Sequence, residues 1–449
     1  MQPLKLGSWL LLGLLCLSSC KSDDDRENPM DTLLEDLLSI EGGPDGINHF
    51  VLPAATELNA IPQDPLNPIT PAKIALGKLL YHETGLAIAP KQDLSKGTFS
   101  CATCHHAAAG FQAGRVQGIA DGGSGFATNG LQRIAMPQYA EDELDVQPLR
   151  SPTVLNSAYQ TNMLWNGQFG ATGVNVGTED RWTPDTPIET NTLGYEGVEI
   201  QAIAGLTVHR LAFDSTLAES TNYPTLFEAA FSNIPLDERY DEEYLGLAIA
   251  AYERTLLANR APFQRWLTGD KNAMTDEEKG GALLFFGKAQ CVSCHSGPAL
   301  NNMDFHALGM KDLIDCSEET FATMEDDKAN LGRGGFTGVE SENYRFKTPQ
   351  LYNLTQSPFY GHGSSFRSVR DVIAYKNRAV AENPRVPSEQ LDPRFQPLEL
   401  SEEEVDLLAA FVENALHDPD LERYVPESIP TGKCFPADDE QSRIDLGCN

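Results

Sequence analysis

The stretch FSCATCHHAAAGF, residues 99–111, places two cysteines and two adjacent histidines within one short run. Nearly the same arrangement, CVSCHSGP, returns at residues 291–298. On a helical turn, residues at i, i+3 and i+4 project from one face, so each run brings two thiols and the following imidazole side by side. The sequence therefore predicts two copies of one binding site, and the rest of the chain has to supply a fold around each.

Cys-x-x-Cys-His is the attachment signature of c-type haem, in which both thiols bond to the porphyrin and the imidazole binds the iron. The first run provides Cys101, Cys104 and His105, and the second provides Cys291, Cys294 and His295. A structural zinc site would need four converging thiolate or imidazole ligands at closer spacing. A thioredoxin-like redox pair would follow a strand and need no histidine. We therefore expect two covalently bound haem c groups, with the two histidines as iron ligands.

The charge balance of the 449-residue chain limits its partners. The chain has 33 basic and 65 acidic residues, a formal net charge of −32 at pH 7. Nucleic acids and anionic membrane surfaces repel such a chain, so neither is expected as a partner, whereas a basic protein is compatible with it. The length suffices for two or three domains with sizeable cores.

The N-terminus is typical of an export signal. Lys5 precedes the apolar run WLLLGLLCL, which is about half the roughly 20 residues that a membrane-spanning helix needs. The run ends in LSSC, which resembles a lipobox, so we expect a lipoprotein signal peptide at 1–20 and lipidation of Cys20; a plain secretory signal is the alternative. Residues 21–45 begin with an acidic stretch and are expected to form a flexible tether. No other segment is apolar enough to span a membrane, which predicts a periplasmic or outer-membrane lipoprotein attached by its lipid alone.

Export also permits disulfide bonds. Cys434 and Cys448 enclose a short polar loop, and a bond between them would staple a tail of residues 426–449. Cys316 is then left over, and its pairing with either of the other two cysteines stays an alternative.

Helix signals dominate the body of the chain. Thr70 followed by proline is typical of a helix start, and TDEE (275–278) and SEEE (401–404) have capping-box spacing. No alternating run predicts a substantial sheet, so we expect a mainly α fold. Long connections rich in Gly, Pro and Asn cover 121–152 and 167–197, and loops of that length are usually functional.

Several separate segments resemble those of one family, in the family's order. They are SPTVLNSAYQTNMLWNG from residue 151, AIAAYERTLLANRAPFQRWLTGDKNAMTDEEKGGALLFFGKAQCVSCHSGP from residue 248, and FKTPQLYNL from residue 346. Over about residues 71–426 the chain is similar to the bacterial di-haem cytochrome c peroxidases and the related cofactor maturase MauG. The resemblance implies two tandem cytochrome c-like helical domains, a peroxidatic one at 46–265 and an electron-transfer one at 270–425.

The resemblance also implies roles for single residues. Trp165 matches the family's tryptophan between the two haems, where its indole would assist electron transfer. Gln201, within GYEGVEIQAIAGLTVHRL, matches the glutamine of the peroxide pocket.

The chain departs from the family next to this glutamine. Where the family has a proline and a catalytic glutamate, this chain has Leu206 and His209, and an insertion at 169–195 precedes the segment. A histidine with a pKa near 6.5 can take a proton from peroxide and return it to the leaving oxygen. We therefore expect His209 to be the distal acid–base residue, with Glu199 as the alternative.

The N-terminal iron is expected to be open on its distal side. Many peroxidases of the family block this iron with a loop histidine until the other haem is reduced. Between Gly110 and Arg150 this chain has no histidine, and His106 directly follows the proximal ligand. Met136 is the alternative ligand from this loop.

At the C-terminal iron the family uses a methionine or tyrosine from a helix as the second ligand. Aligning SFRSVRDVIAYKN (365–377) helix to helix puts Lys376 at this position, whereas an ungapped count puts Tyr375 there. Lysine binds iron only as the neutral amine, which burial favours by lowering its pKa. Lys376 is the expected sixth ligand, and Tyr375, His362 and Met310 are alternatives.

A calcium ion often lies between the family's domains, partly held by an asparagine that this chain replaces with Arg150. The substitution argues against calcium, and its binding stays open. The remaining histidines are expected to be structural or at the surface: His49, His82, His306 and His417.

Together these features predict an exported oxidoreductase, a di-haem cytochrome c peroxidase that reduces hydrogen peroxide to water with electrons from a small cytochrome c or cupredoxin. The alternatives are a MauG-like enzyme that oxidises a partner protein and a non-enzymatic di-haem electron carrier. The sequence leaves open the electron donor and whether the chain forms a homodimer.

Overall fold

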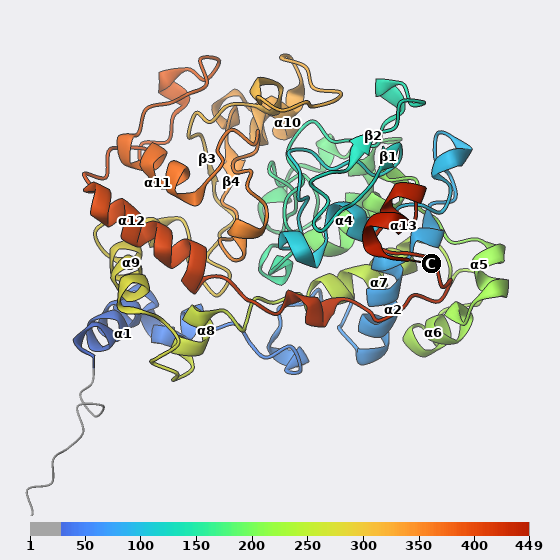
Figure 1. Cartoon of the computed structure of the whole chain (residues 1–449), viewed down its shortest axis with the longest axis horizontal. Coiled ribbons are helices and arrows are strands. Elements are labelled where there is room, and N and C mark those ends of the chain that lie inside the picture. Colours follow the sequence, from blue (N-terminus) through green and yellow to red (C-terminus); the bar gives the residue numbers. More distant parts are fainter. Residues whose placement is uncertain (1–27, 449) are drawn as a thin grey trace, which may run out of the picture.

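Helices make up most of the regular structure in the computed structural model, which describes residues 28–448 (Figure 1). The first group of helices comprises α2 (Pro71–His82), α3 (Cys101–Cys104), α4 (Gly197–Val208), α5 (Ser215–Ser220), α6 (Tyr223–Ala230) and α7 (Glu242–Glu253). The second group comprises α8 (Pro262–Leu267), α9 (Asp276–Phe286), α10 (Arg333–Thr337), α11 (Val369–Arg378) and α12 (Glu402–Ala410), which a π-helical turn (Phe411–Ala415) continues. Two further helices, α1 (Pro29–Glu41) and α13 (Glu440–Leu446), lie near the ends of the chain. The expectation of a mainly α fold is confirmed.

The predicted capping residues begin their helices. The Thr70 hydroxyl accepts a hydrogen bond from the Lys73 backbone N–H at 3.2 Å at the start of α2. Reciprocal bonds between side chain and backbone begin α9 at Thr275 and α12 at Ser401. Each cap satisfies a backbone donor that the first turn of a helix leaves unpaired.

Strands are short wherever the described residues form them. β1 (Gly123–Ser124) pairs antiparallel with β2 (Ile134–Ala135), and β3 (Phe305–His306) pairs antiparallel with β4 (Phe346–Lys347). The first pair closes a hairpin inside the connection over 121–152, and the second pair joins the segments on either side of residues 307–345.

Glycines let the central helices approach each other closely. A Cβ atom on Gly77 of α2 would lie 1.8 Å from the carbonyl oxygen of Ala248 in α7, and one on Gly281 of α9 would lie 2.0 Å from that of Leu407 in α12. No larger residue fits at either crossing, because such distances are far below van der Waals contact. The first crossing lies at the centre of the first group, and the second lies at the centre of the second group.

The first and last described helices pack on the opposite groups, α1 on the second and α13 on the first (Figure 1). Helix α1 lies against α9, with Leu34 and Leu38 fully buried. Its Asp31 accepts a hydrogen bond from Trp266 Nε1 at 2.7 Å and pairs with the buried Lys279 at 2.8 Å. The expectation of a flexible tether over 21–45 is therefore wrong from α1 onward, because the apolar residues of this segment pair with the core of the second group.

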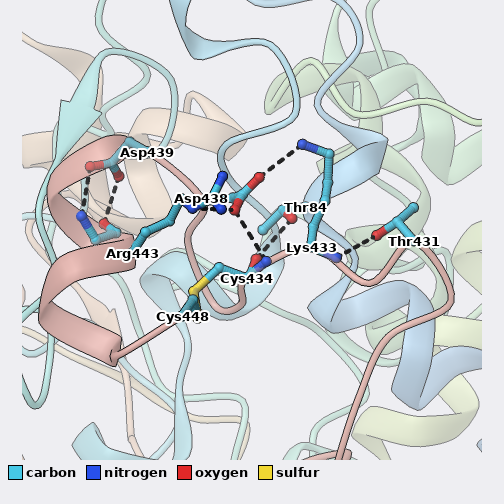
Figure 2. Close-up of a disulfide and its surroundings, with 9 residues drawn as sticks. Thr84, Thr431, Lys433, Cys434, Asp438, Asp439, Arg443 and Cys448 are labelled. Atoms are coloured by element: carbon cyan, nitrogen blue, oxygen red, sulfur yellow. Dashed lines mark hydrogen bonds and ion pairs between the residues drawn. A yellow bond between two sulfur atoms is a disulfide. The ribbon is translucent and has the colours of Figure 1, made fainter.

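The C-terminal tail returns to the first group, where a disulfide closes it (Figure 2). Cys434 and Cys448 form the bond that the sequence predicts, with an S–S distance of 2.05 Å. Thr84 donates a hydrogen bond to the Cys434 carbonyl at 3.0 Å, and Asp439 pairs with the buried Arg133 at 3.0 Å. The tail therefore belongs structurally to the first group, although α12 of the second group precedes it in the chain.

The expected signal peptide at 1–20, the lipid anchor at Cys20 and the first residues of the tether lie outside the described residues. Within residues 28–448, no helix has both the length and the apolar character that crossing a bilayer requires.

Candidate active site

The first Cys-x-x-Cys-His motif begins helix α3 and is held from two sides. The Thr103 hydroxyl donates to the Pro436 carbonyl of the tail at 2.6 Å, and the Tyr81 hydroxyl donates to the His105 carbonyl at 2.5 Å. Burial lowers the pKa of His105 to about 4. Its imidazole is therefore neutral at pH 7, which is the form that binds iron.

The second motif forms a 3-10 turn (Cys291–Ser293) in the wall of a cavity of about 340 Å³. His295 lines this cavity together with both cysteines of the motif. His295 Nδ1 lies 3.1 Å from the carbonyl oxygens of Leu300 and Pro349, so Nδ1 bears the proton and the Nε2 lone pair stays free for a metal. Burial lowers the pKa of His295 to about 4. The rest of the lining is mostly apolar, which suits a porphyrin face.

Two of the candidate sixth ligands line this cavity with side chains that form no hydrogen bond or ion pair among the described residues, although Lys376 Nζ lies 5.9 Å from the centroid of the Phe395 ring. Lys376 and Met310 line it, and burial lowers the pKa of Lys376 to about 8. Tyr375 is buried elsewhere and its hydroxyl donates to the Leu308 carbonyl. His362 lines the cavity, but its Nε2 is bound to the Asp312 carboxylate at 3.1 Å. The geometry therefore favours Lys376 over Tyr375.

The loop ligands considered for the first motif are occupied. His106 Nε2 lies 2.7 Å from the Asn129 carbonyl, and burial lowers the pKa of His106 to about 4. Met136 is buried in an apolar cluster with Ile119 and Leu144.

One face of α4 brings Gln201, Gly205 and His209 together. The three follow each other at i, i+4 and i+8, so they stack along one side of the helix. A Cβ atom on Gly205 would lie 3.7 Å from Gln201 Nε2 and 3.8 Å from His209 Cδ2. Gln201 Oε1 is buried and has no hydrogen-bond partner within residues 28–448. We call the space above Gly205, between the Gln201 and His209 side chains, the α4 niche. Leu206 points instead into the core.

His209 is bound to a carboxylate. Its Nδ1 lies 2.8 Å from Asp145 Oδ2. Burial alone would lower the pKa of His209, but the Asp145 carboxylate outweighs this effect, and the pKa is raised above 6.5. Burial is the largest cause that lowers the pKa of His105, and the charge of His209 is the second largest. The two imidazoles therefore lie close enough to interact electrostatically. Glu199, the alternative to His209, is fully buried in an ion pair with Arg254 at 2.6 Å and is committed to the core.

The backbone around Ser151 separates the two motifs. Both neighbours of Ser151 line the second cavity. A Cβ atom on Gly118 would lie 2.9 Å from both Cys104 Sγ and Ser151 Oγ, so the same segment also borders the first motif. Trp165 lines the second cavity and donates its indole N–H to the Arg150 carbonyl at 2.8 Å. One hydrogen bond therefore joins Trp165 to the backbone beside the first motif.

Arg150 occupies the junction where the resemblance implies calcium. Its guanidinium donates to Gln112 Oε1 at 2.9 Å, to Ser357 Oγ at 2.6 Å and to the Arg115 carbonyl at 3.2 Å. Burial lowers the pKa of Arg150 to about 10. Within residues 28–448, no group of three or more His, Cys, Asp or Glu side chains could hold a metal ion.

The residues at both motifs fit haem. Arg115, Arg150 and Lys347 form no ion pair with a carboxylate among the described residues. Arg115 Nη1 is buried without any hydrogen-bond partner in that part of the chain, and Lys347 Nζ is bound only by uncharged oxygens, Gln160 Oε1 at 2.5 Å and the Asn162 carbonyl at 2.6 Å. A buried cation needs an anion, and haem brings carboxylates. Cysteine pairs, neutral imidazoles, an apolar cavity and unpaired cations together match the chemistry of the cofactor.

Sequence reasoning missed Asp145 and Lys347. Asp145 lies in the loop before Arg150, and no spacing rule joins it to His209. Lys347 lies within the quoted FKTPQLYNL, and the only available signal was that it is the one charged residue of this segment.

Comparison with known proteins agrees with this geometry. Residues 71–272 match the family model for di-haem cytochrome c peroxidases. The chain is 29% identical over 362 residues to the methylamine utilization protein MauG of Methylorubrum extorquens, covering 80% of this chain and 82% of that protein. It is 27% identical over 355 residues to the cytochrome c peroxidase Ccp of Escherichia coli, covering 78% of this chain and 60% of that protein.

The fold has a solved counterpart. A crystal structure of a MauG-like protein associated with microbial copper homeostasis superposes with a TM-score of 0.57 at 21% identity, covering 82% of this chain and 95% of that one. The matched family model, these relatives and the two motifs agree: residues 71–272 match the di-haem cytochrome c peroxidase family, and the chain is similar to both MauG and cytochrome c peroxidases.

Proposed function

We propose that the chain is an exported di-haem peroxidase that reduces hydrogen peroxide to water with electrons from a small redox protein. One haem c would be held by Cys101, Cys104 and His105 in a domain at 46–265, and the other by Cys291, Cys294 and His295 in a domain at 270–425. When bound, each haem supplies an iron that changes oxidation state and can take an oxygen ligand. The balanced reaction, H2O2 + 2 e− + 2 H+ → 2 H2O, also requires residues that move protons.

The α4 niche carries the proposal. It joins an unpartnered amide oxygen at Gln201 to an imidazole at His209, beside the first motif. Peroxide is a small polar molecule that both donates and accepts hydrogen bonds, so it suits such a niche. His209 would take the proton from one peroxide oxygen and return it to the other, while Gln201 holds the substrate in place.

Electrons would enter through the second domain. Trp165 lies between its cavity and the backbone beside the first motif, which is the place for a relay. Lys376 would be the second iron ligand there, as the neutral amine. A net charge of −32 favours a donor with a basic docking face, and a small cytochrome c or cupredoxin is the class we propose.

Steady-state turnover of peroxide with reduced cytochrome c tests this function. The purified two-haem protein should oxidise the donor only when peroxide is present, and His209→Gln should lower kcat/KM by about 10²–10⁴-fold. His417→Gln, far from the niche in the second group, should leave the rate unchanged. Turnover that does not depend on peroxide, or a two-haem protein inert to it, would support a simple electron carrier.

A second candidate is a MauG-like enzyme that oxidises a partner protein, and its support is the similarity to MauG over 80% of the chain. Adding peroxide without a donor separates the two functions. A maturase keeps its oxidised state until a partner protein consumes it, whereas a peroxidase should return to rest once a small donor is supplied.

Export and lipid attachment are part of the proposal and rest on residues 1–20 and on the disulfide, which requires an oxidising compartment. In the native host, Cys20→Ser should move the protein from the membrane fraction to the soluble one.

A further inference from the structure

Asp145 is a buried carboxylate to which the proposed reaction with peroxide assigns no role. Its side chain is only 3% exposed. Its Oδ1 and Oδ2 atoms lie 3.1 and 2.8 Å from His209 Nδ1, and within the described residues this is the only hydrogen bond that the side chain makes. A buried carboxylate with one partner is costly unless that partner needs it, so the pair calls for a functional explanation.

The loop that bears Asp145 is held in place on the backbone. Its N–H donates to the Asp121 carbonyl at 3.0 Å, and its own carbonyl accepts from the Ala120 N–H at 3.1 Å. Asp121 is tied to α4 in turn, because its carboxylate pairs with Arg210 at 2.6 Å. Asp145 therefore presents its carboxylate from a rigid position.

The end of α4 is fixed to the same loop. Arg210 adopts a left-handed backbone, with φ 59°, at a cost of roughly 1–2 kcal/mol for a residue with a side chain. Its guanidinium also donates to the Glu143 carbonyl at 3.0 Å. The side chains of His209 and Arg210 thus both contact the loop that bears Asp145. Arg210 holds a left-handed backbone conformation that a glycine would adopt at lower energy.

The contact decides how the His209 ring is used. Because Asp145 accepts from Nδ1, this nitrogen bears the proton, and in the neutral ring Nε2 keeps its lone pair. The ring borders the α4 niche through Cδ2, the carbon bonded to Nε2, which lies 3.8 Å from a Cβ atom placed on Gly205. Nε2 is therefore the ring nitrogen left to act on the substrate.

We propose that Asp145 is the positioning residue for His209 in the reaction with peroxide. The assignment rests on the proposed function. His209 Nε2 takes the proton from one oxygen of H2O2, and the imidazolium so formed stays paired with the Asp145 carboxylate. As the O–O bond breaks, the departing OH takes the bonding electron pair and this proton and leaves as water. The other oxygen is reduced to a second water by two electrons from the donor and two protons from solvent.

Cyanide binding measures this role without turnover. At neutral pH hydrogen cyanide must lose its proton to bind ferric haem, so its association rate reports on a distal base. Asp145→Asn should slow cyanide association and the peroxide reaction by about tenfold or more. Asp145→Glu should recover part of the rate, and Asp142→Asn, an exposed residue of the same loop, should behave as wild type. Carbon monoxide binding to the reduced protein involves no proton and should be unchanged in every variant.

The double variant separates positioning from a general structural effect. His209→Gln combined with Asp145→Asn should be no slower than His209→Gln alone, because Asp145 acts through the imidazole. Additive losses, or an Asp145→Asn protein with the wild-type cyanide rate, would overturn the assignment. A wild-type protein that binds neither cyanide nor carbon monoxide would instead refute the proposed function.

A measurement on the wild type covers the case in which the variants do not fold. ¹⁵N NMR of the reduced, carbon monoxide-bound protein should show His209 protonated on Nδ1. A neutral ring protonated only on Nε2 would contradict the proposal.

Discussion

Gly205 leaves open a space that any side chain would enter. A methyl group there would make ordinary van der Waals contact with Gln201 and His209, at 3.7 and 3.8 Å, so alanine fits without strain. Gly205→Ala should stabilise the protein by about 0.5–1 kcal/mol, because alanine favours the helix. It should also slow the peroxide reaction by about tenfold or more, because the methyl group displaces the substrate from the α4 niche. Thermal unfolding and stopped-flow mixing with peroxide measure the two effects.

Gly280 provides the matched control. A Cβ atom there would lie 3.6 Å from the Leu407 side chain, so alanine is tolerated in α9 as well. Gly280→Ala should raise stability similarly and leave the peroxide rate as in the wild type. If Gly205→Ala reacted at the wild-type rate, peroxide would not bind in the niche.

Lys376 should determine the spectrum of the second haem. Burial lowers the pKa of Lys376 to about 8, and only the neutral amine binds iron. Because iron competes with the proton, the ligated state should persist at neutral pH and be lost as the pH falls. Lys376→Met should replace the nitrogen-ligated low-spin signal of the oxidised protein, measured by electron paramagnetic resonance, and abolish its pH dependence.

Tyr375→Phe is the control for this ligand. It removes only the hydrogen bond to the Leu308 carbonyl, so the low-spin signal should stay unchanged. A change of that signal with Tyr375→Phe, and none with Lys376→Met, would exchange the two assignments.

Among the elements, α1 precedes both groups in the chain and yet contributes buried residues to the core of the second group. Leu34 and Leu38 are fully buried against the second group, whereas Leu33 on the same helix is 58% exposed. Leu38→Ala should lower the free energy of unfolding by about 2–4 kcal/mol through lost burial and the cavity left behind. Leu33→Ala should change it by no more than about 0.5 kcal/mol.

Denaturant unfolding followed by tryptophan fluorescence measures this difference, since Trp266 is bound to α1 through Asp31. Equal effects of the two alanines would mean that α1 does not pack on α9 in solution.

At the scale of the whole molecule, the Arg150 guanidinium joins the two groups, at the place where the resemblance implies a calcium ion. It donates to Gln112 in the first group and to Ser357 in the second. Arg150→Met should lower the free energy of unfolding by about 3 kcal/mol, because several buried oxygens lose a charged donor. The exposed Arg378→Met should have little effect.

The position of Arg150 also predicts that calcium does not bind at this junction. With a guanidinium at the junction, the chelator EGTA should leave the unfolding temperature and the peroxide rate of the wild type unchanged. A rise in unfolding temperature on adding CaCl2 would show a cation site beside Arg150.

The sequence determined those features whose causes are local. The spacing of Cys101, Cys104 and His105 defines an attachment motif in one helical turn. The Thr275 capping box acts within three residues, and the cysteines of the tail needed only a short loop to meet. The motif, the capping box and the disulfide could be predicted because each forms between residues close in sequence, independently of how the rest of the chain packs.

Tertiary structure alone decided the contacts between distant segments. Asp145 meets His209, Arg150 reaches Ser357, and α1 lies on α9, although no periodicity or spacing joins these partners. Burial makes each of them necessary, because a carboxylate, a guanidinium or a leucine removed from water must find its complement wherever the fold brings one. That complement is a property of the packed chain, and a local stretch of sequence does not contain it.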